Sequence, residues 1–216
     1  MSAIAIPGTH GDPHALGGIE SDDRGWRGPA PKRIVTGFGF WIFILSDMIM
    51  FAALFATYAV LHDRTAGGPT GHDLFNLRNV AIETALLLAS SFSCGLASIA
   101  AGERNKLWFL LAMAVTCILG LGFLALELKE FTGLVARGAG PTRSAFLSAF
   151  FTLVGCHGLH VSAGTLWLLT MMAQVFAKGF RPEIQRRILC FALFWHALDI
   201  IWIAVFTVVY LLGSAT

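Results

Sequence analysis

Five ionisable side chains stand inside long apolar runs of this sequence. His157 and His160 are three residues apart in GCHGLHVSAG, and His196 and Asp199 are three apart in LFWHALDIIW. Residues at this spacing share one face of a helix. Asp47 lies in the middle of the apolar segment WIFILSDMIMF. Because an Asp or His is costly in hydrocarbon, each of the five is expected to face other protein.

Three kinds of site would explain this set. Two histidines on one helix, with a His and an Asp on another, are plausible metal ligands. Buried charges also line proton or ion paths. The third interpretation is a hydrogen-bonded polar cluster that pins helices together or borders a lipid headgroup, since buried polar groups normally need only a partner. The His spacing alone does not choose among them.

Small and aromatic residues accompany the two pairs. Gly164 lies on the same helical face as His160 and predicts the close approach of a neighbouring helix. Trp195 and Trp202 are seven residues apart on a stripe beside Asp199, and each indole N–H is a candidate donor to a carboxylate.

Three glutamates form a secondary set. Glu127 and Glu130, in LELKEF, close the third apolar run beside Lys129, so we expect them on a solvated interfacial face. Glu83 stands one turn into the second run, where we expect it to be partly wet and favoured by the helix dipole. Neither group indicates catalysis.

The elements that position these residues are membrane spans. Hydrophobic residues make up 56% of the 216 residues and charged residues only 13%, roughly half the charged fraction of a soluble domain; the mean hydropathy is +0.71. A helix crosses the hydrocarbon in about 20 residues, and runs of that length exclude β-strands. The sequence therefore predicts an all-α integral membrane protein with five transmembrane helices. The predicted spans are 34–61, 80–101, 107–128, 144–177 and 188–213.

Lysine and arginine predict how the spans are oriented. One side carries ten and the other five, which places the N-terminus in the cytoplasm and the C-terminus in the periplasm. Residues 1–33 are predicted to be a mobile cytoplasmic tail, and 34–213 the membrane domain. The ten are Arg24, Arg27, Lys32, Arg33, Arg104, Lys106, Lys178, Arg181, Arg186 and Arg187; the five are Arg64, Arg78, Lys129, Arg137 and Arg143.

Several function classes are disfavoured. The net charge of +2 comes from scattered residues, which argues against nucleic-acid binding. The cysteines form no CxxC pair and are interpreted as packing residues. An odd number of spans without matching Gly/Pro-broken helices argues against an inverted-repeat transporter. The four cysteines are Cys94, Cys117, Cys156 and Cys190.

The sequence resembles subunit III of the haem–copper respiratory oxidases. The matching segments occur in order across all five runs: FWIFILSDMIMFAALFATYAVL, ETALLLASSFSC, LELKEFTGL, SAFLSAFFTLVGCHGLHVSAG and LFWHALDIIWIAVFTVVYLLG. Within that family it is most similar to the bo-type ubiquinol oxidases, through DRTAGGPTGHDLF, GAGPTRSAFLSAFF and Glu83, where cytochrome c oxidases tend to carry Asn.

The resemblance implies a non-catalytic subunit of a proton-pumping ubiquinol oxidase in a bacterial plasma (inner) membrane. Haem, copper and ubiquinol would belong to subunit I, and subunits I, II and IV would be the partners. This chain would hold no cofactor or metal of its own; it would stabilise subunit I and support proton uptake. A polar cluster bordering bound phospholipid, formed by Asp47, His157, His160, His196 and Asp199, becomes the favoured site. The alternatives are subunit III of a bacterial cytochrome c oxidase or, from another class, an independent proton or ion transporter.

Overall fold

The computed structural model describes residues 32–67 and 76–215, so the predicted tail of residues 1–33 lies almost wholly outside the described residues. The regular elements within these ranges are all helical, and five helices are long and apolar enough to span a membrane. The predicted all-α, five-span architecture is confirmed. The helices are α1 (Lys32–Leu61), α3 (Leu77–Gly102), α4 (Lys106–Ala136), α5 (Ala145–Lys178) and α6 (Pro182–Val205), the last continued by a π-helix (Phe206–Leu211) and by α7 (Leu212–Ala215).

Two helices are longer than the apolar runs that predict them. α4 continues eight residues beyond the predicted end at 128, and α6 begins six residues before the predicted start at 188. An apolar run ends at the first polar residues, whereas a helix continues through polar residues until a glycine or proline interrupts it. After α4 the breaker is Gly138, whose φ is +77°. Before α6 it is Gly179, with φ +69°, followed by Pro182 in the first turn.

Capping residues fix the beginnings of three helices. Asn76 accepts a hydrogen bond from the backbone N–H of Arg78, and Asn105 accepts one from Trp108. Ser144 Oγ accepts from the N–H of Leu147. Each bond satisfies a donor that the first turn of a helix leaves unpaired. These caps fix where α3, α4 and α5 begin.

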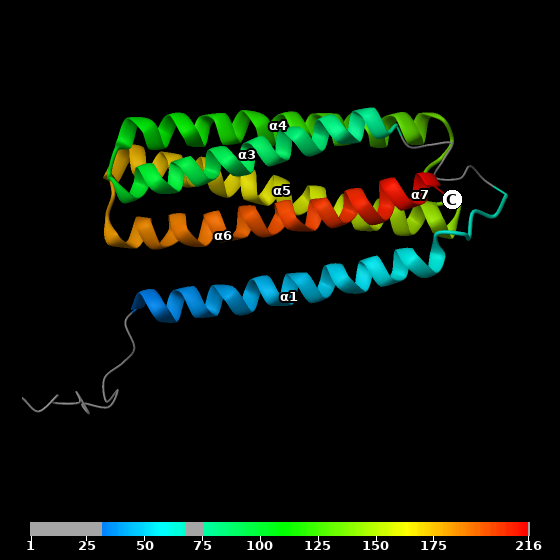
Figure 1. Cartoon of the computed structure of the whole chain (residues 1–216), viewed down its shortest axis with the longest axis horizontal. Helices are drawn as coiled ribbons and strands as arrows, with labels where there is room; N and C mark the ends of the chain where they lie inside the picture. The colour runs from blue at the N-terminus through cyan, green and yellow to red at the C-terminus, as the bar shows by residue number, and fades with distance from the viewer. Residues whose placement is uncertain (1–31, 68–75, 216) are drawn as a thin grey trace, which may run out of the picture.

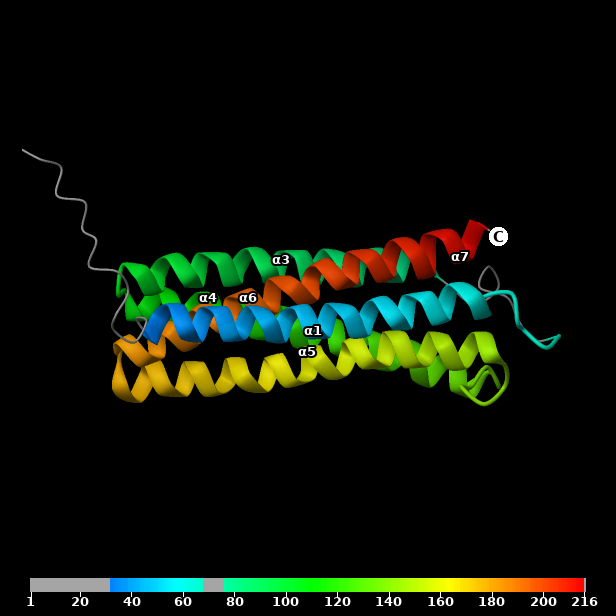
Figure 2. The same cartoon turned by 90° about the horizontal axis from the view of Figure 1, so that it is seen from below.

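Helices α3 to α6 form a four-helix bundle, and α1 lies on its outside (Figure 1). In sequence order, each bundle helix packs against the next, and α6 returns to α3. α1 packs mainly on α5 and α6, and the view from below shows it alongside α5 (Figure 2). Of the 18 most apolar consecutive residues in each span, only 11% are buried in α1, against 56% in α6 with its π-helical continuation. The rest of α1 is therefore free to face lipid or another protein.

The α3–α4 and α5–α6 connections lie at one end of the molecule, together with the start of α1 (Figure 1). We call this the basic end, because its two connections and the flanking helix turns carry six lysines and arginines: Arg104, Lys106, Lys178, Arg181, Arg186 and Arg187. The opposite end holds the start of α3, the end of α4 and the C-terminal helix.

Candidate functional site

Trp195 on α6 joins all four bundle helices. Its indole Nε1 donates a hydrogen bond of 3.1 Å to Ser90 Oγ on α3. Its ring lies against Gly120 of α4 and Gly164 of α5, where an added Cβ would lie only 3.1 Å and 3.0 Å from ring carbons. The prediction that Gly164 permits close helix approach is therefore confirmed, and Gly120 is a second such position that the sequence did not single out.

Trp202 lies two turns further along α6 and is fully buried. Its Nε1 donates a 3.0 Å hydrogen bond to Thr84 Oγ1 on α3. The prediction that the indoles hold a carboxylate is wrong, because both Trp195 and Trp202 donate to hydroxyls. Each hydroxyl in turn donates to a carbonyl of its own helix, Thr84 to Val80 and Ser90 to Leu87. All donors are thus satisfied without a charge in the apolar interior.

His196 and Asp199 also face the junction of α3 and α6. His196 Nδ1 and Ser91 Oγ are hydrogen bonded at 2.7 Å. Asp199 lies within electrostatic reach of His196, but its buried Oδ1 has no hydrogen-bond partner among the described residues. This pair, like the two tryptophans, connects the first and last helices of the bundle.

Asp47 and His160 bring α1 against α5. Asp47 Oδ2 lies 3.7 Å from His160 Nε2, and both side chains are about one-fifth exposed. His160 Nδ1 donates to the Cys156 carbonyl at 2.8 Å, which fixes a proton on that nitrogen. At 3.7 Å the Asp47 carboxylate and His160 Nε2 are within ion-pair range but beyond hydrogen-bond distance. The contact places an acid beside an imidazole where α1 packs on α5.

His157 is completely buried in an aromatic cage, although it shares α5 with His160. Its ring centroid lies 5.0 Å from that of Trp202 on α6 and 5.8 Å from that of Phe123 on α4. The ring of Phe51 on α1 is close to both histidines, with its centroid 6.4 Å from that of His157 and 5.3 Å from that of His160. Neither nitrogen of His157 has a hydrogen-bond partner among the described residues.

The three glutamates converge near the opposite end of the bundle. Glu83 of α3 is 1% exposed and Glu127 of α4 is 4% exposed. Both lie within electrostatic reach of each other and of Glu130, which accepts a 3.5 Å hydrogen bond from Tyr210 of the π-helix. One oxygen of Glu83 and one of Glu127 have no partner in the described part of the chain.

The expected solvated position is therefore wrong for Glu127 and Glu83, which are buried, whereas Glu130 is half-buried. The helix does not end at Glu130 but continues to Ala136, so Glu127 points into the bundle rather than out at a helix end. A glycine on α5 makes the room: a Cβ at Gly158 would lie 2.7 Å from both Glu127 carboxylate oxygens. Glu83 is likewise covered: α3 begins at Leu77, before the predicted start at 80, so almost two turns of helix precede Glu83.

The structure thus divides the predicted set instead of gathering it into one cluster. Asp47 meets His160 at the α1–α5 contact, His157 occupies the aromatic cage, and His196 and Asp199 lie between α3 and α6. Among the described residues, no three His, Cys, Asp or Glu side chains are grouped as metal ligands would be. Ser90, Ser91 and Thr84, which pair with the α6 side chains, were not predicted; the signal available was the run of hydroxyls in TALLLASSFS.

Comparison with known proteins identifies relatives over most of the chain. The family model described as cytochrome c oxidase subunit III matches residues 23–214. Subunit 3 of the cytochrome bo(3) ubiquinol oxidase of Pseudomonas aeruginosa is 54% identical over 179 residues, 83% of this chain and 86% of that protein. Quinol oxidase subunit 3 of Bacillus subtilis is 42% identical over 81% and 86% of the two chains. Cytochrome c oxidase subunit 3 of a Bacillus species is also 42% identical, over 81% and 84%.

Proposed function

This chain belongs to the cytochrome c oxidase subunit III family, and from that premise we propose that it is subunit 3 of a bo(3)-type ubiquinol oxidase. The observation that carries the proposal is 54% identity to a bo(3) ubiquinol oxidase subunit over 83% of the chain. The alternative, subunit III of a cytochrome c oxidase, is supported by the 42% identity to the Bacillus protein of that name. The higher identity favours the quinol oxidase.

In this role the chain is one subunit of a complex in a membrane. The partners are subunits I, II and IV of the oxidase, with haem, copper and ubiquinol in subunit I. The membrane is the bacterial inner membrane, with the basic end toward the cytoplasm and the C-terminus in the periplasm. The excess of Lys and Arg at the basic end supports this orientation.

The side chains described above would serve this function in two ways. The α3–α6 contacts, with Trp195 at their centre, hold the bundle rigid as a packing surface for the larger subunit. The partly exposed Asp47–His160 contact pairs an acid with an imidazole, which suits support of proton uptake. A bound phospholipid beside this contact is part of the proposal, since Asp47 and His160 are each about one-fifth exposed where α1 packs on α5.

The experiment is a purification of the tagged full chain from its native membrane in mild detergent. We expect haem-containing partners to co-purify, the reduced-minus-oxidised spectrum to show b- and o-type haem, and the preparation to oxidise ubiquinol but not cytochrome c. Oxidation of cytochrome c would instead establish the alternative. A chain that comes alone or as a homo-oligomer, and moves ions in liposomes, would be a transporter and would contradict both.

A further inference from the structure

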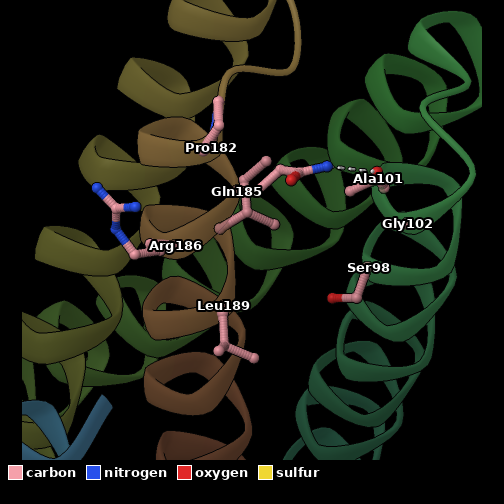
Figure 3. Close-up of a pocket in the computed structure, with 8 residues that line it drawn as sticks. Ser98, Ala101, Gly102, Pro182, Gln185, Arg186 and Leu189 are labelled. Atoms are coloured by element: carbon pink, nitrogen blue, oxygen red, sulfur yellow. Dashed lines mark hydrogen bonds between the residues drawn. The ribbon is translucent and has the colours of Figure 1, made fainter. Parts of the chain in front are cut away.

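Buried polar atoms without a partner lie away from the hollow at the basic end. That hollow is a pocket of about 530 Å³ between the end of α3 and the start of α6 (Figure 3). Across it, Gln185 Nε2 donates a 3.4 Å hydrogen bond to the Ala101 carbonyl. Among the described residues, no buried side-chain atom that lacks a hydrogen-bond partner belongs to its lining. Two such atoms belong instead to Glu83 and Glu127, near the opposite end.

These two glutamates are buried without the donors that a carboxylate needs. Glu83 on α3 and Glu127 on α4 are both more than nine-tenths buried. Glu83 Oε2 and Glu127 Oε1 have no hydrogen-bond partner in the described ranges 32–67 and 76–215. An ionised carboxylate in this position gives up its hydration and receives no full set of hydrogen bonds in exchange. The pair therefore needs a ligand that neutralises its charge.

The surrounding charges make the same demand. Glu83 and Glu127 lie within electrostatic reach of each other and of Glu130. Arg137, just after α4, lies within electrostatic reach of Glu130. The residue of α5 that faces Glu127 is Gly158, which brings no charge. With three carboxylates against one guanidinium, full ionisation would leave a net charge of −2 inside the membrane, which is costly.

A proton fits this group better than a metal ion does. Ca²⁺ and Mg²⁺ bind about six or more oxygen ligands. In the part of the chain that the structure describes, no three His, Cys, Asp or Glu side chains are placed as the ligands of one ion would be. Space is also short at Glu127, since a Cβ at Gly158 would lie 2.7 Å from both carboxylate oxygens. A proton needs neither a coordination shell nor a cavity.

Tyr210 and Glu130 connect the buried pair to the surface. Glu130 is half-buried, so it is the most exposed of the three glutamates. Tyr210 of the π-helix is fully buried, and its hydroxyl donates to Glu130 Oε2 at 3.5 Å. Tyr210 also lies within electrostatic reach of Glu83 and Glu127. Because a hydroxyl both donates and accepts, Tyr210 can receive a proton from a buried carboxyl while it passes its own to Glu130.

We propose that Glu83 and Glu127 form a proton-binding site that holds at least one exchangeable proton at neutral pH, and that Tyr210 and Glu130 connect it to the end opposite the basic end. On release, the O–H bond of the buried carboxyl breaks and its proton moves to the Tyr210 oxygen. The Tyr210 proton moves to Glu130, and Glu130 gives a proton to water. The buried carboxyl becomes a carboxylate, and the phenol stays neutral. In the orientation proposed above this exchange is with the periplasm; only that assignment of side rests on the proposed function.

The test is infrared difference spectroscopy on the full chain, purified with the proteins that accompany it. A protonated carboxyl has a carbonyl stretch that a carboxylate lacks, and this band shifts when deuterium replaces the proton. At neutral pH, we expect the wild-type-minus-variant spectrum to show such a band for at least one of E83Q and E127Q. The matched control is E103Q, which changes an exposed acid in the α3–α4 connection and should show no band.

The rate of deuterium exchange tests the connection to the surface. E130Q and Y210F should keep the band but slow its shift in heavy water by about a hundredfold, the lower end of what one positioned acid–base group contributes. K129Q changes an exposed neighbour of Glu130 and should exchange at the wild-type rate.

Three results would overturn the proposal. Difference spectra without a band for both E83Q and E127Q would mean that both carboxyls are ionised. A band that appears only after a chelator is added would mean that a divalent cation occupies the pair. Exchange at the wild-type rate in both E130Q and Y210F would mean that the proton does not leave through these groups. None of these results depends on oxidase activity, so each is distinct from a failure of the proposed function.

Discussion

Two regions of the bundle hold their buried polar groups in opposite ways. Where α3 meets α6, which we call the hydroxyl seam, the donors of Trp195 and Trp202 reach Ser90 and Thr84, and these hydroxyls donate onward to backbone carbonyls. Nearer the opposite end, in what we call the acid layer (Glu83, Glu127 and Glu130), two buried carboxyls keep an oxygen without a partner. Helix α3 contributes to both.

The difference distinguishes buried polar side chains that stabilise the fold from buried polar side chains that destabilise it. A satisfied buried hydrogen bond contributes about 0.5–1.5 kcal/mol, and an orphaned buried group costs about 1–3 kcal/mol. The hydroxyl seam therefore stabilises the bundle, whereas the acid layer is a cost that the rest of the packing offsets. Acids that stay buried inside a membrane at such a cost suggest a functional role.

The largest effect is expected where the packing around Trp195 is disturbed. Gly164→Leu would place a side chain at a position where Cβ alone lies 3.0 Å from Trp195 and 3.1 Å from Phe194. Rigid rings cannot move aside easily, so we expect a loss of about 3 kcal/mol and a lower thermal midpoint in detergent. Gly95→Leu, with nothing within 4 Å, is the control. An equal loss in both would show that the Trp195 contact is not special.

Next in size is the removal of one hydroxyl. Ser90→Ala leaves the Trp195 indole N–H buried without an acceptor, which should cost about 1–3 kcal/mol. Ser98→Ala is matched to it, because the Ser98 hydroxyl bonds only to the Cys94 carbonyl of its own helix. Thermal unfolding of the two variants should therefore separate. Equal midpoints would mean that the indole hydrogen bond contributes nothing.

In the acid layer we expect the loss of a carboxylate to leave the stability of the protein unchanged or to raise it. Glu127→Gln keeps the shape and removes an acid whose Oε1 has no partner, so the thermal midpoint should stay the same or rise. Glu103→Gln, on the exposed α3–α4 connection, controls for the change of charge. A marked fall for Glu127→Gln alone would mean that the carboxylate is held by a partner.

The smallest effect on stability is predicted for Asp47→Asn. The Asp47–His160 contact is 3.7 Å long and partly exposed, so its loss should cost less than about 1 kcal/mol. Haem content per purified complex should remain at the wild-type level, because no cofactor ligand is removed. Loss of haem in this variant would contradict the proposed role of the chain.

The sequence was sufficient for the architecture but not for the partners of the polar residues. Long apolar runs determine five helices, and Gly164 on the face of His160 already indicated the close approach of a neighbouring helix. Which side chain meets which depends on the rotation of each helix against its neighbours, and no periodicity specifies that. Thus His157 and His160, on one face, meet different partners, Trp202 and Asp47. Glu127 turns inward because Gly158 on another helix leaves space.

The most direct test of the contrast is one thermal-unfolding experiment on Ser90→Ala and Glu127→Gln, in the same detergent and with the same co-purifying proteins. If the hydroxyl seam stabilises the bundle and the acid layer does not, Ser90→Ala will melt below wild type while Glu127→Gln melts at or above it. A fall of similar size in both variants would contradict the account.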